Sequence, residues 1–338
     1  MRIAGLATLV CVVGCAPLLT QPSVGDMSKM MAQSQALMAQ AEVARAAAEV
    51  NCEPVRKQDP GFEEERVIGQ ELAITLCARV GHFYVDGATE KDPKKLIEAL
   101  ASQTPVALPE SGKNVVSAHV AVVGKNLARY SGRPDLPWVF GVLDSQSPQA
   151  FSTPGGYVFV TTALLKKMTN EAQLAGVLAH EISHVVHKHV LRTYVEARFK
   201  QCVAARYAAH LIETGTQNKA VSTEVARYAR SFDTPSDRSK ADPGFTQFIM
   251  QVMMMLVQSG NEKDVEFQTD RAALELVSFA GYDALEYEKF LTGWAQASHP
   301  ASLDRALKLE ALRKGELSDF VHGTAKPTLG QVFAPLGQ

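Results

Sequence analysis

Two histidines four residues apart, with a glutamate directly after the first, are the residues of this sequence best placed to do chemistry. His180, Glu181 and His184 form an H-E-x-x-H pattern within a segment whose apolar residues recur with helical spacing. Side chains four residues apart lie on one face of a helix, so both imidazoles could reach a single zinc ion. Glu181 could then contact a water on that metal without being a ligand. The pattern predicts a hydrolytic zinc site, with a chance match of so short a motif as the alternative.

A third ligand is expected from a second helix that faces the first. Glu266 is the best candidate, because the residues that follow it make its helix largely apolar. Asp270 lies on the same face and could accept the free N–H of a ligand histidine. The alternative is that both carboxylates are solvated charges on a helix surface. For His187 and His189, which follow the motif, we expect a place at the surface or behind the ligands rather than ligation.

The elements that must position these residues are mostly helices. Apolar residues recur with helical spacing across 170–195, which carries the motif, and most of 197–292 is also expected to be helical. Aromatic and β-branched residues in 138–143 and 157–161 predict two strands close enough to pair. The predicted fold class is therefore α+β, mainly helical, with a small antiparallel sheet.

Composition narrows the class of protein. Of 338 residues, 46% are hydrophobic and 21% are charged, which is typical of a globular chain and not of a disordered or polytopic membrane protein. Lysine and arginine number 34 against 36 aspartates and glutamates, and no long run of either sign occurs. Nothing in this balance indicates a nucleic-acid partner.

The N-terminus resembles the leader of an exported protein. Arg2 is followed by an apolar stretch, 3–13, that is too short to span a bilayer as a helix. The stretch ends at Gly14-Cys15, which resembles a bacterial lipobox, so Cys15 is expected to carry lipid and anchor the protein to a membrane. Ala16 in place of aspartate favours the outer membrane. A plain signal peptide or a short uncleaved anchor is the alternative.

The segment after the leader predicts a helical extension. Residues 27–50 are rich in Ala, Met and Gln and lack Pro and Gly, which favours a helix that packs on its own protein, with a partner or a membrane surface as the alternative. The stretch 52–61 contains two prolines and is expected to be a joint. In an exported protein Cys52 and Cys77 could form a disulfide, although two buried free thiols are the favoured interpretation.

The order of these motifs is similar to that of the HtpX-like and CAAX-prenyl-protease-type zinc metallopeptidases, peptidase family M48, and in particular of their exported, BepA-like lipoprotein branch. The resemblance covers about 62–312 and departs from the family at Gln149 and Ala163, where asparagine and glycine are usual. The residues that carry it, besides the H-E-x-x-H motif, are Ala150–Thr161 with its Pro-Gly-Gly turn, Glu266–Asp270, Ala280–Asp283, His299-Pro300 and Arg305.

The resemblance implies a zincin-type domain with assigned roles. His180, His184 and Glu266 would hold one zinc ion, and Glu181 would be the general base. A substrate chain would pair along the strand that includes Phe151, Pro154, Gly155, Gly156 and Tyr157. His299, if it is not an ordinary loop histidine, could cap the zinc as a removable fourth ligand or stabilise the oxyanion, and Arg305 could also steady that charge. The expected division is 1–15 as signal peptide, 16–61 as helical extension and linker, 62–320 as metallopeptidase domain and 321–338 as tail.

The activity implied is that of a zinc endopeptidase of the bacterial cell envelope, on its periplasmic side, acting on misfolded or misassembled polypeptides. A chaperone-like or scaffold protein that binds client chains and seldom cuts is the alternative. A purely structural zinc site is disfavoured, since a glutamate beside the first histidine would have no purpose there.

Overall fold

Helices and one small sheet make up the structure, a computed structural model. It describes residues 24–84, 92, 94, 95, 97, 115–215, 219–232, 252, 263–293 and 302–318; the leader with Cys15 and the tail 321–338 lie outside them. The mainly helical α+β fold is confirmed. The elements are α1 (Val24–Lys57), α2 (Phe62–Val80), β1 (His82–Phe83), α4 (Val115–Ala128), β2 (Val139–Asp144), β3 (Ala150–Thr153), β4 (Tyr157–Thr161), α5 (Thr162–Leu165), α6 (Glu171–Val186), α7 (His189–Gly215), α8 (Lys219–Arg230), α10 (Lys263–Phe279), α11 (Ala284–Gly293) and α12 (Ser302–Lys314).

The sheet is mixed, so the expectation of an antiparallel sheet is wrong. Its order is β1-β2-β4-β3, and β2 pairs with β4 in parallel while the two outer pairs are antiparallel. The reason is the short strand β3, which precedes β4 in the chain and forms a hairpin with it. That hairpin turns at Gly155 and Gly156, whose φ values of 79° and 95° suit glycine. It therefore returns β4 alongside β2 in the same direction.

Both faces of the sheet are covered by helices. Along β2 and β4, successive side chains belong to two apolar clusters on opposite faces of the sheet. On one face, α4 and α6 pack against Phe140, Val142, Val158 and Val160. The intervening residues, such as Leu143, face α2. Strands buried on both faces read as continuous apolar runs, as these do. The sheet thus fixes α6 on one side and α2 on the other.

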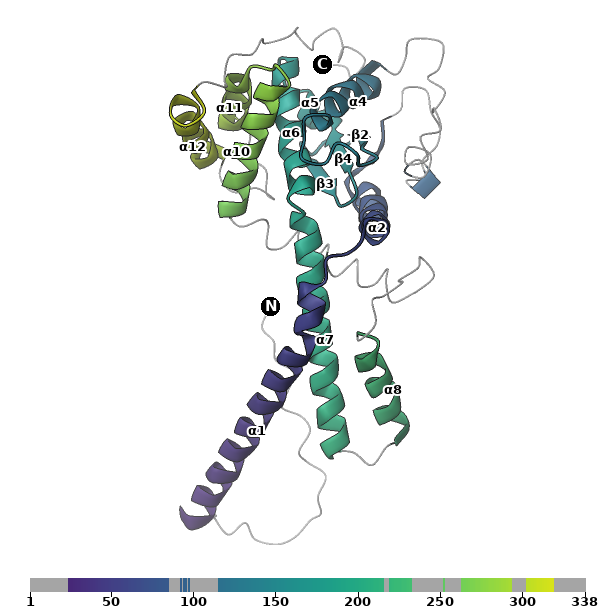
Figure 1. The fold of residues 1–338 in the computed structure, drawn as a ribbon, viewed down its shortest axis with the longest axis vertical. Helices are drawn as coiled ribbons and strands as arrows, with labels where there is room; N and C mark the ends of the chain where they lie inside the picture. Colours follow the sequence, from purple (N-terminus) through teal and green to yellow (C-terminus); the bar gives the residue numbers. More distant parts are fainter. Residues whose placement is uncertain are drawn as a thin grey trace.

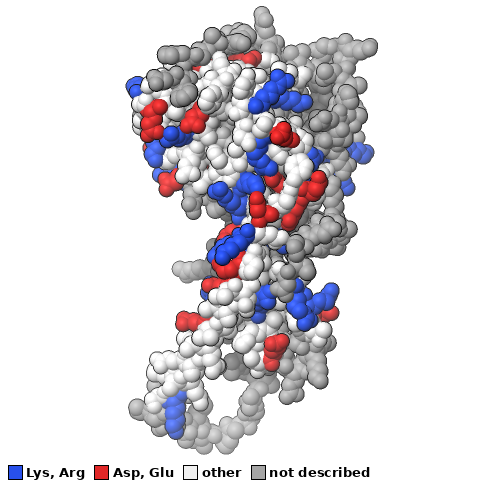
Figure 2. Space-filling model, in the orientation of Figure 1, with Lys and Arg blue, Asp and Glu red and all other residues white. Residues whose placement is uncertain are grey.

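The helix α6 lies at the centre of a larger lobe, between the sheet and the group α10, α11 and α12 (Figure 1). One apolar cluster runs through all of these elements, and it makes them a single packed unit. Among the described residues, no helix is both long and apolar enough to cross a membrane. On the face in Figure 2, the described basic and acidic side chains are intermixed rather than gathered by sign.

Three helices extend away from this lobe as an arm: α1, the greater part of α7, and α8 (Figure 1). The helix α1 runs through Pro54 to Lys57, so the joint expected at 52–61 is wrong for most of that stretch. Cys52 and Val55 pack on α7 in a small apolar cluster, which holds this last part of α1 in place.

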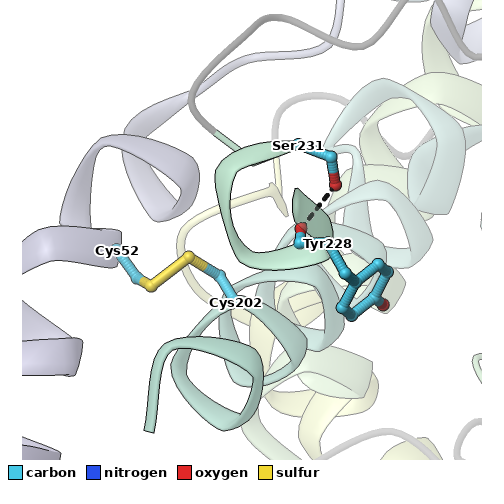
Figure 3. The surroundings of a disulfide bond; sticks show 4 residues. All are labelled: Cys52, Cys202, Tyr228 and Ser231. Atoms are coloured by element: carbon cyan, nitrogen blue, oxygen red, sulfur yellow. Dashed lines mark hydrogen bonds between the residues drawn. A yellow bond between two sulfur atoms is a disulfide. The ribbon is translucent and has the colours of Figure 1, made fainter. Parts of the chain in front are cut away.

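A disulfide joins α1 to α7, but not between the cysteines named from the sequence. Cys52 pairs with Cys202, which lies 150 residues further along the chain (Figure 3). Cys77 is instead a free thiol on α2, buried beneath the sheet, where burial raises its pKa. A Cys52–Cys77 bridge is excluded, because α2 packs on the sheet while α1 packs on α7; the favoured expectation of two buried free thiols is right for Cys77 and wrong for Cys52.

The long helix expected over 170–195 is in fact two helices. The helix α6 ends at Val186, and α7 begins at His189. Between them Lys188 has a φ of 57°, a left-handed conformation that is uncommon outside glycine. No Gly or Pro stands at this break to announce it in the sequence.

Candidate metal centre

The helix α6 carries three of the polar residues into the interior of the lobe. It begins at Asn170, whose side chain accepts a hydrogen bond from the backbone N–H of Gln173 and so caps the helix. Every residue from Ala172 to Val185 is buried. Because apolar neighbours on the same helix pack into the core, the motif residues are held on a rigid, water-excluded element.

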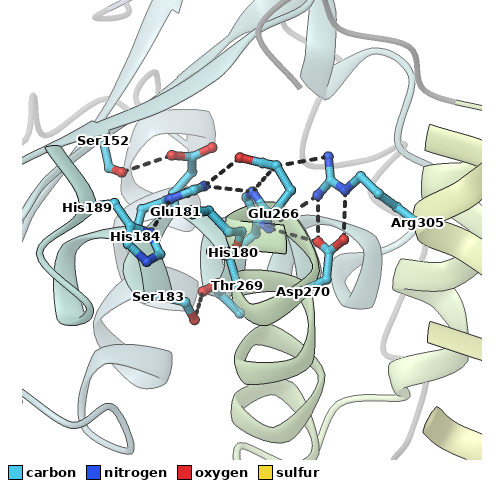
Figure 4. Close-up of polar contacts among 12 residues, drawn as sticks. Ser152, His180, Glu181, Ser183, His184, His189, Glu266, Thr269, Asp270 and Arg305 are labelled. Carbon is cyan, nitrogen blue, oxygen red and sulfur yellow. Dashed lines mark hydrogen bonds and ion pairs between the residues drawn. The ribbon is translucent and has the colours of Figure 1, made fainter. Parts of the chain in front are cut away.

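Two histidines of α6 and a glutamate of α10 converge on one point (Figure 4). Nε2 of His180 lies 3.0 Å from Nε2 of His184 and 3.3 Å from Oε2 of Glu266, and Nε2 of His184 lies 3.5 Å from Oε1 of Glu266. Two ligand atoms of a tetrahedral zinc ion are expected about 3.3 Å apart, given bonds of about 2.0–2.1 Å. The three side chains are 0–5% exposed. Their spacing and donor types fit one small cation such as zinc.

A carboxylate supports the first of these histidines. Oδ1 of Asp270 lies 2.9 Å from Nδ1 of His180, the contact expected from the sequence. Tyr287 donates to the same carboxylate at 2.8 Å. Burial and the charge of Arg305 lower the pKa of His180, but the hydrogen bonds to Asp270 and Glu266 outweigh both and raise it to about 9. The bond to Asp270 orients the ring of His180 and leaves its Nε2 facing His184 and Glu266.

Arg305 lies behind the ligands and joins both carboxylates of α10. Its Nε donates to Oδ2 of Asp270 at 2.7 Å, and its Nη1 lies 3.5 Å from Oε2 of Glu266. The side chain is 1% exposed. Burial raises the pKa of Asp270, but the bonds from Arg305 and His180 more than offset it and hold that pKa below its usual value. Arg305 therefore keeps Asp270 an acceptor toward His180.

Glu181 points from α6 toward the edge of the sheet. Its Oε2 accepts a hydrogen bond of 2.9 Å from Oγ of Ser152, a residue of β3. Burial raises the pKa of Glu181 to about 7, although the neighbouring charge of His180 and the bond from Ser152 act in the other direction. A carboxylate with a pKa near neutrality is suited to accept and return a proton.

A further histidine lies against the second ligand. Nδ1 of His189 is 2.8 Å from Nδ1 of His184, on the side opposite the three converging atoms (Figure 4). Burial, together with the charges of His187 and Arg192, lowers the pKa of His189 to about 4. Near pH 7 its ring is thus neutral.

The Pro-Gly-Gly turn is fastened to α2 and not only to the sheet. The backbone N–H of Gly155 donates to Oε1 of Glu65 at 3.1 Å, and Arg133 donates to both oxygens of that carboxylate at 2.7 and 2.9 Å. Thr153 donates to the carbonyl of Gly69 at 2.8 Å. These bonds fix the end of β3 beside the metal centre.

Most of the residues named from the sequence meet here, and some do not. His180, Glu181, His184, Glu266, Asp270 and Arg305 lie together (Figure 4). Tyr157 lies in the inner strand β4, and its side chain faces α2. Phe151 stands on the outer strand β3 and packs on Phe159. His299 lies outside the described residues.

Sequence reasoning did not assign Ser152 or Glu65 to the site, and for His189 it left a place at the surface and a place behind the ligands open. Ser152 stands within the Pro-Gly-Gly strand, where the resemblance draws attention to the backbone and not to this hydroxyl. Glu65 reads from the sequence as an acidic residue in the first turn of a helix. Their roles depend on which elements pack together, and helical or strand periodicity does not contain that information.

Comparison with known proteins agrees with this arrangement. The sequence profile of Peptidase family M48 matches residues 115–313, more than half of the chain. The chain belongs to peptidase family M48.

The chain is also similar to three individual proteins. Mitochondrial metalloendopeptidase OMA1 of Schizosaccharomyces pombe is 37% identical over 97 residues, 29% of this chain and 29% of that protein. The beta-barrel assembly-enhancing protease of Yersinia pestis is 25% identical over 234 residues, 69% of this chain and 40% of that protein. Protease HtpX of Legionella pneumophila is 39% identical over 75 residues, 21% of this chain and 26% of that protein.

Each of these matches spans less than half the length of the M48 relative. The matched region of the family profile includes both helices that carry the converging side chains, α6 and α10, together with the three strands β2, β3 and β4. The arm helix α1 precedes it.

Proposed function

We propose that this chain is a zinc-dependent endopeptidase of the bacterial cell envelope, which hydrolyses peptide bonds in misfolded or misassembled proteins. The observation that carries the proposal is the convergence of His180, His184 and Glu266, whose ligand atoms all lie within 4.8 Å of one another. Two imidazole nitrogens and one carboxylate oxygen are the donor set of many hydrolytic zinc sites. Membership of peptidase family M48 supports the same reaction.

When bound, a zinc ion supplies Lewis-acid chemistry, lowering the pKa of a coordinated water toward about 7 and polarising the scissile carbonyl. Glu181 then accepts the proton of the attacking water and later returns it to the leaving amine. Ser152 holds the carboxylate of Glu181 in position through the bond of 2.9 Å between them. Apolar walls from α6 and the sheet exclude bulk water from this exchange.

The strand β3 is the element proposed to bind the substrate backbone. It is the outer strand, and among the described residues it pairs with β4 alone. An extended peptide can add to such an edge through main-chain hydrogen bonds, which give modest selectivity for sequence. The position of Ser152 on β3, in contact with Glu181, places this edge next to the general base. A peptide on β3 would therefore present its carbonyls to the metal centre.

The role proposed for Arg305 follows from its surroundings. Since Arg305 contacts Asp270 and Glu266, we propose that it positions these carboxylates rather than the oxyanion. For His299 the proposal stays the one made from the sequence, a removable fourth ligand or an oxyanion contact. Lipidation of Cys15 and attachment to the outer membrane are likewise proposed from the leader. The relatives named beta-barrel assembly-enhancing protease support a setting in the bacterial cell envelope.

A second candidate function is a latent or client-binding form of the same protein. The near-complete burial of the three ligands and of Glu181, at 0–5% exposure, favours it, since a substrate needs access to these atoms. Comparing client binding by wild type and by Glu181→Gln separates the two functions. Chaperone-like activity that persists in this variant would belong to the binding function, and activity that disappears would belong to hydrolysis.

The deciding experiment measures zinc content and the cleavage of an unfolded, casein-type substrate. Wild type and Glu181→Gln are each expected to hold about one zinc per chain, since Glu181 is not a ligand. Turnover should fall roughly 10²–10⁴-fold in Glu181→Gln, because the general base is removed while the metal stays. Glu275→Gln, a change at a partly exposed glutamate of α10, is the matched control and should cleave as wild type does.

Two results would contradict the proposal. One is cleavage by Glu181→Gln at the wild-type rate. The other is a zinc content that Glu266→Ala leaves unchanged, because Glu266 is completely buried at the point where both histidines converge.

A further inference from the structure

The break between α6 and α7 brings His189 back against the metal ligand His184. On a continuous helix, side chains five residues apart point about 140° away from each other, so the two rings would not meet. Here the helix ends at Val186, and Lys188 takes a φ of 57°. His189 begins the next helix, and its Nδ1 lies 2.8 Å from Nδ1 of His184. The break between the two helices therefore allows the rings of His184 and His189 to meet.

The chemistry of the two rings gives the contact a direction. A neutral imidazole that binds metal through Nε2 carries its proton on Nδ1. Nε2 of His184 is the atom that faces His180 and Glu266, at 3.0 and 3.5 Å. With a metal on Nε2, the proton of His184 would be on Nδ1 and would be donated to Nδ1 of His189, which would then carry its own proton on Nε2. His189 is the acceptor that selects this tautomer.

We propose that His189 is a positioning residue, which fixes the ring orientation and the tautomer of His184 for binding the metal. His184 then depends on His189 as His180 depends on Asp270, with an imidazole acceptor in place of a carboxylate. The left-handed residue Lys188 is part of the same device, since it supplies the turn that returns His189 to the ligand. The inference rests on the metal site proposed above.

The test is the zinc affinity of single variants, measured by competition with a chelator. His189→Ala removes the acceptor and is expected to weaken zinc binding about 10–100-fold, the usual effect of losing a group that orients a ligand. His189→Asn keeps an acceptor, because its side-chain oxygen takes the place of Nδ1, and should bind within about three-fold of wild type. His187→Ala is the matched control; the His187 ring lies 5.4 Å from that of His189, and its loss should leave the affinity unchanged.

Circular dichroism and thermal unfolding of the metal-free forms establish that each variant is folded before its affinity is compared. Equal zinc affinity in wild type and His189→Ala would overturn the inference, and so would an equal loss in His187→Ala. Wild type that binds no zinc would instead overturn the proposed function together with this inference. Recovery of affinity in His189→Asn distinguishes a positioned hydrogen bond from a loss of packing.

Discussion

The lobe and the arm of this molecule are held together by different kinds of interaction. In the lobe, one large apolar cluster joins helices and sheet, and charged side chains are buried in its interior. In the arm, α1, α7 and the end of α8 share a small cluster of seven buried residues, and a disulfide joins α1 to α7. The N-terminal half of α1 keeps large apolar side chains in the open, with Met30 63% and Leu37 66% exposed. The lobe is stabilised by burial, and the arm by a covalent link.

The difference follows from what each region has to hold. Buried charges are costly unless they pair, and in the lobe Arg305 pairs with Asp270 while Asp270 pairs with His180. This arrangement fixes ligand geometry, which a zinc site requires. Among the described residues the arm contributes no metal ligand, and apolar contacts, one cross-link and the ion pair between Arg56 and Glu196 keep α1 on α7. Rigidity is therefore concentrated around the metal centre.

The strongest way to break this comparison is to remove one partner of the buried pair in the lobe. Arg305→Met leaves the carboxylate of Asp270 buried without its main partner, and the free energy of unfolding should fall by about 3–5 kcal/mol. Urea unfolding of the metal-free protein measures it. The matched control is Arg271→Met on α10, the helix of Asp270, where the arginine is 47% exposed and its ion pairs should be worth no more than about 1 kcal/mol.

A double variant sharpens this prediction. Adding Asp270→Asn to Arg305→Met removes the unpaired charge, so part of the lost stability should return. Zinc affinity should not rise above that of Arg305→Met, since an amide in place of the Asp270 carboxylate is the weaker acceptor toward His180. Exposed ion pairs are worth up to about 1 kcal/mol. If the free energy of unfolding of Arg305→Met lay within about 1 kcal/mol of the wild-type value, buried charge would not be what distinguishes the lobe from the arm.

The corresponding change in the arm is removal of the disulfide. Cys52→Ser with Cys202→Ser should destabilise the protein by about 2–4 kcal/mol, because the unfolded chain regains the freedom that the link removes. Zinc affinity should stay at the wild-type value, since neither cysteine contacts the metal centre. Thermal unfolding and zinc titration measure the two quantities, with Cys77→Ala as a control that leaves the disulfide intact. Finding the peptides of Cys52 and Cys77 linked by a disulfide under non-reducing conditions would contradict the Cys52–Cys202 assignment.

Helical periodicity was enough to predict which residues share a face, but not which faces meet. His180 and His184 are four residues apart, as are Glu266 and Asp270, so each pair could be assigned to one side of its helix. That α10 faces α6 was inferred from the need for a third metal ligand and agreed with the resemblance to a family, because spacing within a helix says nothing about its neighbours. Arg305, on a third helix, was named from the resemblance alone.

The features that the sequence did not reveal depend on contacts between distant segments. Cys202 lies 150 residues from Cys52, and only the packing of α1 on α7 brings them together. The break at Lys188 lacks the glycine or proline that marks most helix ends, so propensity favoured one continuous helix. The strand β3 has four residues, too few for a periodic pattern to be read from the sequence.

The smallest expected effect concerns a contact that serves catalysis rather than stability. Ser152→Ala removes the hydroxyl that donates to Glu181 at 2.9 Å. A hydrogen bond to a charged group is worth about 1.5–3 kcal/mol, so kcat should fall about tenfold or more when the base loses its orientation. Zinc content and KM should change little, because Ser152 contacts neither the ligands nor the outer edge through this hydroxyl. Ser152→Thr keeps a hydroxyl and should restore much of kcat.

Ser183→Ala is the matched control for this change. Ser183 is also buried beside the ligands, but its hydroxyl donates to the carbonyl of Ala179 within α6, so its loss should leave kcat near the wild-type value. If Ser152→Ala raised KM and left kcat unchanged, the hydroxyl would act on substrate binding along β3 and not on the base. If Ser152→Ala instead lowered the free energy of unfolding as much as Arg305→Met does, the hydroxyl of Ser152 would stabilise the lobe rather than orient Glu181. Only a fall in kcat at constant zinc content separates the positioning of Glu181 from the packing that surrounds it.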